Sequence, residues 1–172
     1  MAAPPGPRAV HDRRWKARSL ADYIEGTWRS LGQPCTQRAV EIALSYAKRR
    51  GEAFDPSTAV LAHGDPHAAN ALASSSGPRG FKFVDPDGLF IEPAYDLGVV
   101  MRGWNAELIE GGASGVSRDR SSFLSSLTGV DEQSIWEWSY IERLSSGLTM
   151  RALGYVEAAE YLAAADALAR EG

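Results

Sequence analysis

The sequence predicts an α+β fold that is mostly helical, with a small β-hairpin sheet near the middle of the chain. Two observations lead to this prediction. Apolar residues recur at the 3.6-residue spacing of helices in segments before residue 52 and after residue 93. Between these segments, short runs of β-branched and aromatic residues alternate with turns rich in glycine, proline and serine. The length of 172 residues fits one domain with a substantial hydrophobic core.

The first third of the chain is expected to form two helices behind a tail. Residues 1–17 are rich in proline, arginine and small side chains, and they are predicted to be a flexible tail or linker. A helix is predicted over residues 20–31 because five residues share one face: Leu20, Ile24, Thr27, Trp28 and Leu31. Thr36 is the predicted N-cap of a second helix, and Gly51 is its predicted left-handed C-cap.

The middle of the chain is expected to form turns and short strands. Residues 55–57 read as a turn, and residues 60–62 and 70–72 read as strand segments on either side of a polar loop. Residues 74–80 have the composition of a hairpin-like turn, and the alternation in residues 81–84 predicts the strand that follows it.

Helices are expected again in the last third of the chain. The pattern predicts a helix over residues 94–104, and the glycine-rich residues 111–115 are expected to form a mobile loop. Asp131 is the predicted N-cap of a helix that ends near residue 146. An alanine-rich helix over residues 148–169 follows, with a bend near Gly154.

Composition and charge exclude several classes of protein. The formal net charge of -4 does not favour binding to nucleic acid, and no apolar run is long enough to span a membrane. The first residues have no apolar segment of the kind found in a secretory signal. Cys35 is the single cysteine, so no intramolecular disulfide can form and a cytoplasmic location is expected. Composition leaves the oligomeric state open.

Polar side chains gather in the loop between the first two predicted strands. Asp65 and Asn70 lie five residues apart in this loop, and Asp85 arrives directly after the next strand. One carboxylate can take a proton from an acceptor hydroxyl, while an amide and a second carboxylate can hold Mg²⁺ through hard oxygen atoms. The combination therefore indicates phosphoryl transfer. On local residues alone, each side chain also has an ordinary alternative as a turn or strand-cap residue.

Three motifs follow one another in this order: His63-Gly64-Asp65-x-His67-x-x-Asn70, then Val84-Asp85, then Glu92-Pro93-Ala94-Tyr95-Asp96-Leu97. Together they resemble the aminoglycoside phosphotransferase family, which shares the protein-kinase catalytic fold. The resemblance runs from about residue 19 to the C-terminus. It implies that Asp65 is the catalytic base and that Asn70 and Asp85 bind Mg²⁺. It also implies ATP or GTP as phosphoryl donor and a hydroxyl of a small molecule, such as an aminoglycoside or another metabolite, as acceptor.

The same resemblance implies supporting roles for other residues of the motifs. His63 would anchor the catalytic loop to the metal-binding strand, and Asp96 would accept backbone hydrogen bonds that brace the loop. His67 is a candidate contact to phosphate or substrate, although a plain loop histidine is an equal alternative. Asp87 is a further candidate contact, with a solvated turn residue as the more ordinary interpretation. The kinase Asp-Phe-Gly motif is replaced here by Asp85-Pro86-Asp87.

The alternation of His63, Asp65 and His67 also permits a different hypothesis, a zinc or iron hydrolase. On a regular strand, these three side chains would point to one face and could bind a transition metal. Gly64 and Pro66 argue against a regular strand.

Acidic residues in the C-terminal half are candidates for holding the ammonium groups of an aminoglycoside, with a solvated acidic surface as the alternative interpretation. They are Glu107, Glu110, Asp131, Glu132 and Glu137.

A kinase normally has an N-terminal lobe with a glycine-rich turn over the phosphates and a lysine on a nearby strand. Only 62 residues precede His63, and they contain no Gly-x-Gly-x-x-Gly pattern. Residues 18–172 are therefore expected to be the C-terminal lobe alone, exposing apolar surface where the missing lobe docks. Such a chain would be weakly active or inactive by itself. The alternative hypothesis is a non-catalytic remnant that acts as a binding or interaction module.

Overall fold

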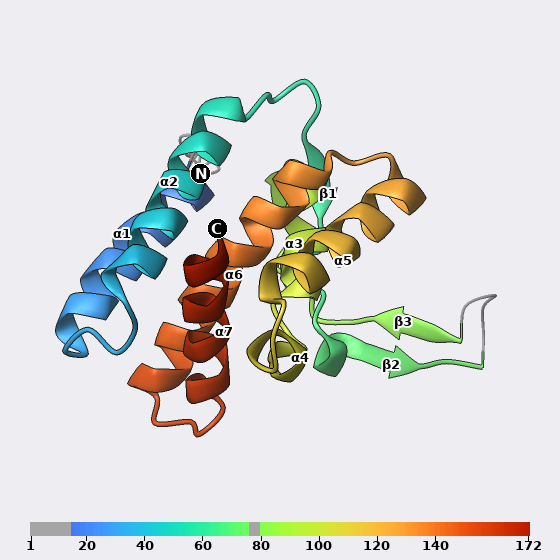
Figure 1. The fold of residues 1–172 in the computed structure, drawn as a ribbon. Helices are drawn as coiled ribbons and strands as arrows, with labels where there is room; N and C mark the ends of the chain where they lie inside the picture. The colour runs from blue at the N-terminus through green and yellow to red at the C-terminus, as the bar shows by residue number, and fades with distance from the viewer. Residues whose placement is uncertain (1–14, 76–79) are drawn as a thin grey trace, which may run out of the picture.

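A computed structural model describes residues 15–75 and 80–172, and helices dominate this part of the chain (Figure 1). The helices are α1 (Trp15–Ser30), α2 (Gln37–Ala53), α3 (Ala94–Met101), α4 (Asn105–Ile109), α5 (Ala113–Thr128), α6 (Glu132–Ala152) and α7 (Ala158–Glu171). The prediction of a mostly helical α+β protein is confirmed. None of the described helices combines the length and the apolar character that crossing a membrane requires.

The strands form two separate antiparallel pairs rather than the single sheet that the sequence predicted. They are β1 (Val60–Ala62), β2 (Ala71–Ala73), β3 (Phe81–Phe83) and β4 (Leu89–Ile91), and the short 3-10 turn η1 (Ala68–Asn70) precedes β2. β1 pairs with β4, with Leu61 opposite Phe90. β2 pairs with β3, with Ala71 opposite Phe83, so the strands on either side of the predicted hairpin turn pair as expected. Residues 76–79 of that turn lie outside the described part of the chain. β4 was not predicted, and Asn70 belongs to η1 instead of a strand.

Helix α6 lies at the centre of the helical part of the molecule (Figure 1). It packs against α1, α2, α3, α5 and α7. Its apolar side chains Ile135, Trp138, Ile141, Leu144 and Leu148 are buried in one continuous core. Burial on most of its sides explains why α6 also carries buried polar residues. β1 lies beside this core near α3, whereas the β2–β3 hairpin projects away from the helices (Figure 1).

The first two helices differ from the prediction at their ends. α1 begins at Trp15, so residues 15–17 belong to a helix and not to the predicted tail. Ala17 is buried, which explains why the helix starts this early. Residues 1–14 lie outside the described part of the chain. Thr36 is the N-cap of α2, as predicted, and accepts a hydrogen bond from Ala39 N. The predicted left-handed cap at Gly51 is wrong, because the helix continues to Ala53.

The segment between the strands and α6 differs most from the prediction. The expected helix over residues 94–104 ends at Met101, and Trp104 adopts a left-handed backbone before α4. The prediction of a mobile loop over residues 111–115 is wrong. Gly111 and Gly112 turn the chain with positive φ angles, and α5 begins directly after them. This helix was not predicted because its sequence is rich in serine and has few apolar residues.

The last two helices confirm the prediction only in part. Asp131 caps α6, accepting a hydrogen bond from Ser134 N at 2.7 Å, as predicted. α6 continues to Ala152, six residues beyond the predicted end. The predicted bend near Gly154 is a full break, where Gly154 has a φ of 80° and α7 begins at Ala158.

Candidate active site

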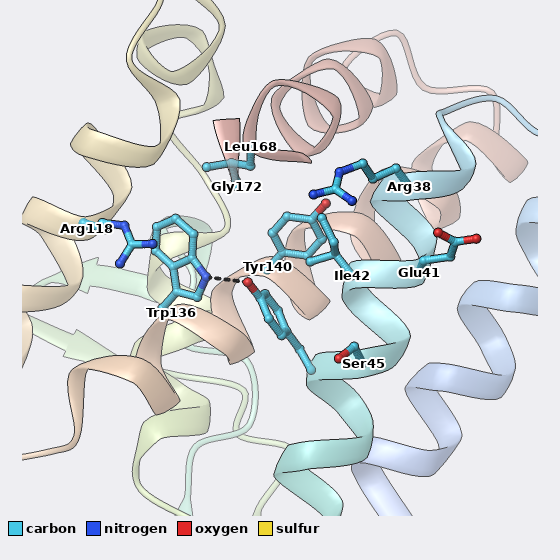
Figure 2. Close-up of a pocket in the computed structure, with 10 residues that line it drawn as sticks. Arg38, Glu41, Ile42, Ser45, Arg118, Trp136, Tyr140, Leu168 and Gly172 are labelled. Atoms are coloured by element: carbon cyan, nitrogen blue, oxygen red, sulfur yellow. Dashed lines mark hydrogen bonds between the residues drawn. The ribbon is translucent and has the colours of Figure 1, made fainter. Parts of the chain in front are cut away.

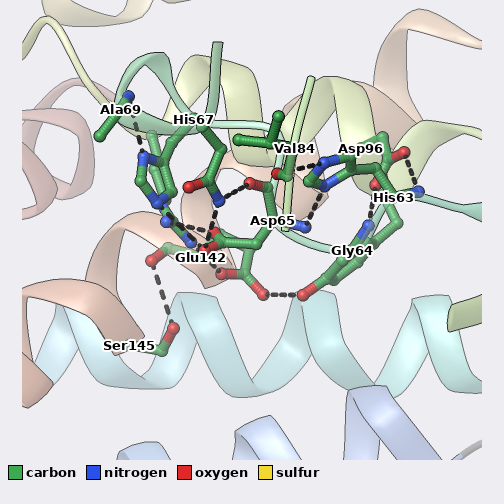
Figure 3. A network of polar contacts seen from close by, with 12 residues as sticks. His63, Gly64, Asp65, His67, Ala69, Val84, Asp96, Glu142 and Ser145 are labelled. Carbon is green, nitrogen blue, oxygen red and sulfur yellow. Dashed lines mark hydrogen bonds and ion pairs between the residues drawn. The ribbon is translucent and has the colours of Figure 1, made fainter. Parts of the chain in front are cut away.

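The loop between β1 and β2 is held by a carboxylate from α3. Asp96 accepts hydrogen bonds from His63 N at 2.7 Å and from Gly64 N at 2.9 Å (Figure 3). Hydrogen bonds to a charged acceptor are stronger than those between neutral groups. Asp96 lies in the first turn of α3, so the loop is attached to a helix that itself packs closely on α6.

His63 connects the same loop to the strand that precedes Asp85. Its Nε2 lies 3.1 Å from Val84 O, and its Nδ1 accepts a hydrogen bond from Asp65 N at 3.3 Å. This pattern fits a neutral imidazole that is protonated on Nε2. The ring also packs edge-on against Phe83, with 5.4 Å between the ring centroids. His63 thus ties the loop to the end of β3.

Asp65 lies at the centre of a group of polar contacts, with its side chain 30% exposed. Its Oδ1 lies 2.6 Å from Arg102 Nη2, and its Oδ2 lies 3.1 Å from His67 Nε2 (Figure 3). Asn70 Nδ2 donates to Asp65 O at 2.9 Å, with Asp65 Oδ2 3.5 Å away. The structure therefore brings Asp65, His67 and Asn70 together in one loop and adds Arg102 to them.

Arg102 was not among the predicted site residues. It lies 37 residues beyond Asp65, just after α3, and its Nη1 is 3.3 Å from Glu142 Oε2. Tyr95 OH in turn donates to Glu142 Oε1 at 2.7 Å. Burial alone would lower the pKa of Arg102, but the carboxylates of Glu142 and Asp65 outweigh it and raise the pKa. The guanidinium therefore stays charged and fixes the Asp65 carboxylate in place.

The turn that carries Asp85 and Asp87 packs against the loop between β1 and β2. Val84 N donates to Asn70 O at 2.9 Å, and Gly88 N donates to His63 O at 3.1 Å. The two segments approach so closely that a Cβ atom on Gly64 would lie 2.7 Å from the Cβ of Asp87. Asp85 has a φ of 58°, a conformation that is uncommon for a non-glycine residue and often occurs at functional sites.

The oxygen atoms of Asn70 and Asp85 suit a hard divalent cation. The Asn70 amide nitrogen already donates to Asp65, which leaves its Oδ1 without a hydrogen-bond partner among the described residues. The Asp85 carboxylate likewise makes no hydrogen bond or ion pair within residues 15–75 and 80–172. Each of these two side chains therefore has an oxygen atom of the kind that such a cation prefers.

The alternative of a transition-metal site receives no support from the geometry. In the described part of the chain, no three His, Cys, Asp or Glu side chains lie together as a metal-binding group. Both ring nitrogens of His63 contact backbone atoms of the protein. Residues 63–67 form an irregular loop, so the strand-like alternation that this hypothesis requires does not occur.

A pocket of about 320 Å³ opens next to the loop between β1 and β2. His67 and Arg102, which both contact Asp65, form part of its wall. Trp104 and residues from α3, α6 and α7 complete it.

A second pocket, of about 270 Å³, lies between α2, α5, α6 and the end of α7 (Figure 2). Its wall is aromatic: Trp136 Nε1 donates to Tyr46 OH at 3.1 Å, and Arg118 lies over the Trp136 ring at 5.0 Å from its centroid. The residues that line it do not include any of the predicted site residues. This pocket is therefore separate from the candidate active site.

The acidic residues considered for binding ammonium groups do not line the pocket beside Asp65. Glu107 pairs with Arg120 at 2.7 Å, and Glu137 pairs with Arg49 at 2.8 Å. Asp131 serves as a helix cap, and the hydrogen bonds that it accepts from the side chain and backbone of Ser134 lower its pKa. The structure thus assigns structural contacts to three of these five carboxylates.

One of three comparisons with known proteins finds a match. A family model described as aminoglycoside/hydroxyurea antibiotic resistance kinase matches residues 20–154, a range that contains all the predicted site residues. Neither a comparison with curated proteins nor one with solved structures finds a match. Because the family model covers more than half of the sequence, the chain belongs to the aminoglycoside/hydroxyurea antibiotic resistance kinase family.

Proposed function

We propose that this chain forms the acceptor-binding and catalytic lobe of a small-molecule O-phosphotransferase that uses ATP or GTP and Mg²⁺. One observation carries the proposal. The loop that holds Asp65 and Asn70 is tied by Asp96 to α3 and by His63 to the strand before Asp85. A base and two oxygen ligands on adjoining, mutually fixed segments are what phosphoryl transfer to a hydroxyl requires.

Asp65 is the proposed general base. A carboxylate oxygen has two lone pairs, so Asp65 can keep its contacts with Arg102 and His67 and still accept a hydrogen bond from an acceptor hydroxyl. As the hydroxyl oxygen attacks phosphorus, its proton moves to Asp65. The ion pair with Arg102 fixes the carboxylate to a residue that lines the pocket in which the acceptor would lie.

Asn70 Oδ1 and the Asp85 carboxylate are the proposed Mg²⁺ ligands. Bound Mg²⁺ neutralises charge on the phosphates of the nucleotide during transfer. The described residues include the proposed base and the proposed metal ligands but no glycine-rich phosphate loop. We therefore expect the chain to need a nucleotide-binding lobe, and to be weakly active or inactive without one.

The test is transfer of radiolabelled γ-phosphate from ATP or GTP to a panel of hydroxylated acceptors. The chain is assayed alone and with the nucleotide-binding lobe of a family member added as a separate polypeptide. Transfer is expected to be weak for the chain alone and strong with the added lobe. Asp65→Asn, which keeps the shape of the side chain but removes the base, should reduce the rate by about 100-fold or more.

Asp119→Asn is the matched control, since Asp119 is an exposed carboxylate on α5, away from the loop. It should leave the rate unchanged. An undiminished rate in Asp65→Asn would remove Asp65 from the role of base. Absence of transfer with the added lobe, to acceptors that bind the chain, would favour the alternative of a non-catalytic binding module.

A further inference from the structure

A charged side chain from the middle of α6 is fully buried in the core. Arg143 is only 1% exposed, and it makes no ion pair with a carboxylate in the described part of the chain. Its Nη1 atom also has no hydrogen-bond partner among these residues. Burial, together with the charge of Arg120, lowers the pKa of Arg143 to about 10, so the guanidinium is still charged at neutral pH.

Burying such a group without a carboxylate costs free energy. A charge that leaves water loses its hydration, and an apolar side chain of similar volume often fills a buried site at lower cost. The guanidinium contacts the C-terminal end of α3, whose negative dipole offsets only part of this cost. Packing therefore does not explain an arginine at position 143, and its hydrogen bonds indicate a more specific role.

The hydrogen bonds of Arg143 hold both ends of the short corner between α3 and α4. Its Nη2 donates at 2.5 Å to the carbonyl oxygen of Met101, the last residue of α3. Its Nε donates at 2.8 Å to Oδ1 of Asn105, the first residue of α4, which is itself buried. From α5, Arg120 Nη1 donates to Trp104 O at 3.3 Å. The corner is therefore fixed by side chains from two neighbouring helices.

The corner carries three residues of the candidate site between its two ends. Arg102 Nη2 lies 2.6 Å from Asp65 Oδ1, and Arg102, Gly103 and Trp104 all line the pocket next to the loop between β1 and β2. Trp104 has φ 53° and ψ 48°, a left-handed conformation that a bulky residue rarely adopts. Such a conformation persists only where surrounding contacts enforce it, and the hydrogen bonds at the ends of the corner are contacts of this kind.

We propose that Arg143 is a positioning residue of the candidate active site: it fixes the α3–α4 corner from inside the core, and the corner holds Arg102 against the Asp65 carboxylate. This inference rests on the proposed phosphotransferase function and adds to it a residue that contacts neither Asp65 nor the proposed metal ligands. Because Arg143 acts through Arg102, loss of either arginine should disturb Asp65 in the same way. A misplacement of about 1 Å can lower a rate by about 100-fold, even when the mutated residue lies far from the reacting atoms.

The test compares Arg102→Met, Arg143→Met and the double variant of the 172-residue chain in the transfer assay with the added nucleotide-binding lobe. Each single variant should lower kcat by about 10-fold or more, with the KM for the nucleotide unchanged. The double variant should lower kcat no further than the more impaired single variant, because the two residues belong to one series of contacts. Independent effects would multiply to about 100-fold or more and would overturn the inference. An unchanged kcat in Arg143→Met would overturn it as well.

Hydrogen exchange of the corner, measured on the chain alone without nucleotide, gives a second readout that does not depend on phosphoryl transfer. In Arg143→Met, the amides of residues 101–105 should exchange at least about 10-fold faster than in the parent. Ile24→Ala is the control, because Ile24 is fully buried in α1 and its truncation leaves a cavity outside the corner. The two variants are compared at the same free energy of unfolding, which is set with urea. Equally fast exchange of the corner in Ile24→Ala would show that Arg143 contributes only to general stability.

Arg143→Lys is the second variant, which keeps the charge if Arg143→Met fails to fold. The lysine ammonium lacks the planar fork whose two nitrogen atoms reach Met101 O and Asn105 Oδ1. The corner should therefore still exchange faster than in the parent, and exchange identical to that of the parent would overturn the inference. If no protein, including the parent, transferred phosphate while the corner of the Arg143 variants exchanged faster, the proposed function would fail and the role of Arg143 in fixing Arg102 would be supported.

Discussion

The side chain of Asp96 connects two backbone amides of the loop between β1 and β2 to α3. Asp96→Asn replaces the two charged carboxylate oxygens with one neutral amide oxygen and an NH₂ group. The hydrogen bonds that Asp96 accepts from His63 N and Gly64 N should therefore weaken. The expected loss of stability is about 1.5–3 kcal/mol, because hydrogen bonds to charged groups contribute that much. Urea denaturation measures the loss, and hydrogen exchange at these two amides should become faster.

The control for this change is Asp119→Asn, which removes an exposed carboxylate from α5. It should alter the free energy of unfolding by less than about 0.5 kcal/mol. If the two variants unfolded at the same urea concentration, Asp96 would not brace the loop in solution.

Cys35 lies between α1 and α2 and is only 8% exposed, and its carbonyl accepts a hydrogen bond from Trp28 Nε1. Burial, together with the nearby Asp166 carboxylate, raises the pKa of the thiol to about 12. At pH 8, alkylation by iodoacetamide should be at least about 100-fold slower in the folded chain than in urea, since the thiolate is the reactive form. Equal rates in the two states would show that Cys35 is accessible.

The raised pKa of Cys35 predicts how the free energy of unfolding depends on pH. The folded state keeps the Cys35 proton at pH values where the unfolded chain loses it, because the folded pKa is above the ordinary value of 9.0. The stabilising contribution of this group is therefore complete below about pH 9 and is lost as the pH rises from about 9 to about 12. A Cys35→Ser variant should show a smaller decrease in stability over that range.

The sequence predicts the loop residues of the candidate site but not the residues that contact Asp65 from outside the loop. Asp65 and Asn70 lie five residues apart, and their contact follows from local spacing. Arg102 lies 37 residues after Asp65 in the sequence, and Glu142 lies 40 residues after Arg102. No local pattern marks these two residues, because their positions depend on how α3 packs on α6.

At the scale of elements, the helix caps were predictable because each depends on one residue and its immediate neighbours. Thr36 and Asp131 accept the hydrogen bonds expected of N-caps. The errors occur where packing decides the structure. α5 has a serine-rich sequence and forms against α4, α6 and α7, while β4 has only three residues and is fixed by pairing with β1.

The packing of α3 on α6 depends on the absence of a side chain at Gly98. A Cβ atom there would lie 2.5 Å from the Cβ of Trp138 and 2.8 Å from Ser139 N, so one helix would have to move. Gly98→Ala should therefore lower the free energy of unfolding by about 1–3 kcal/mol. Thermal and urea denaturation measure this change. Since α3 also carries Asp96, phosphoryl transfer should decrease in the same variant.

Gly26→Ala gives a matched control within α1. A Cβ atom at Gly26 would have no neighbour within 4 Å, and the residue is exposed in a helix. Alanine should raise stability there by about 0.5–1 kcal/mol, because glycine is a poor helix former. Stabilisation by Gly98→Ala as well would show that α3 and α6 are further apart than in the structure.

At the scale of the whole molecule, burial of apolar residues is uneven. The helices share one buried core around α6. The strand pairs instead expose large apolar side chains: Leu61 is 78% exposed, Phe90 60% and Leu72 54%. Leu61 and Phe90 are direct neighbours across β1 and β4, so they form one apolar surface. Extended apolar surfaces on soluble proteins usually mark a place where another protein or domain binds.

We expect the nucleotide-binding lobe of a family member to bind the chain through the exposed face of β1 and β4. Leu61→Lys and Phe90→Lys place a charge in this apolar surface and should each weaken binding of the lobe by about 10-fold or more, because the ammonium would be buried without a partner. Isothermal titration calorimetry with the separate lobe measures the change. Val156→Lys is the control, since Val156 is 85% exposed but lies in the turn between α6 and α7. Equal weakening by all three changes would indicate a non-specific effect of charge, and no weakening by the strand variants would mean that the lobe binds elsewhere.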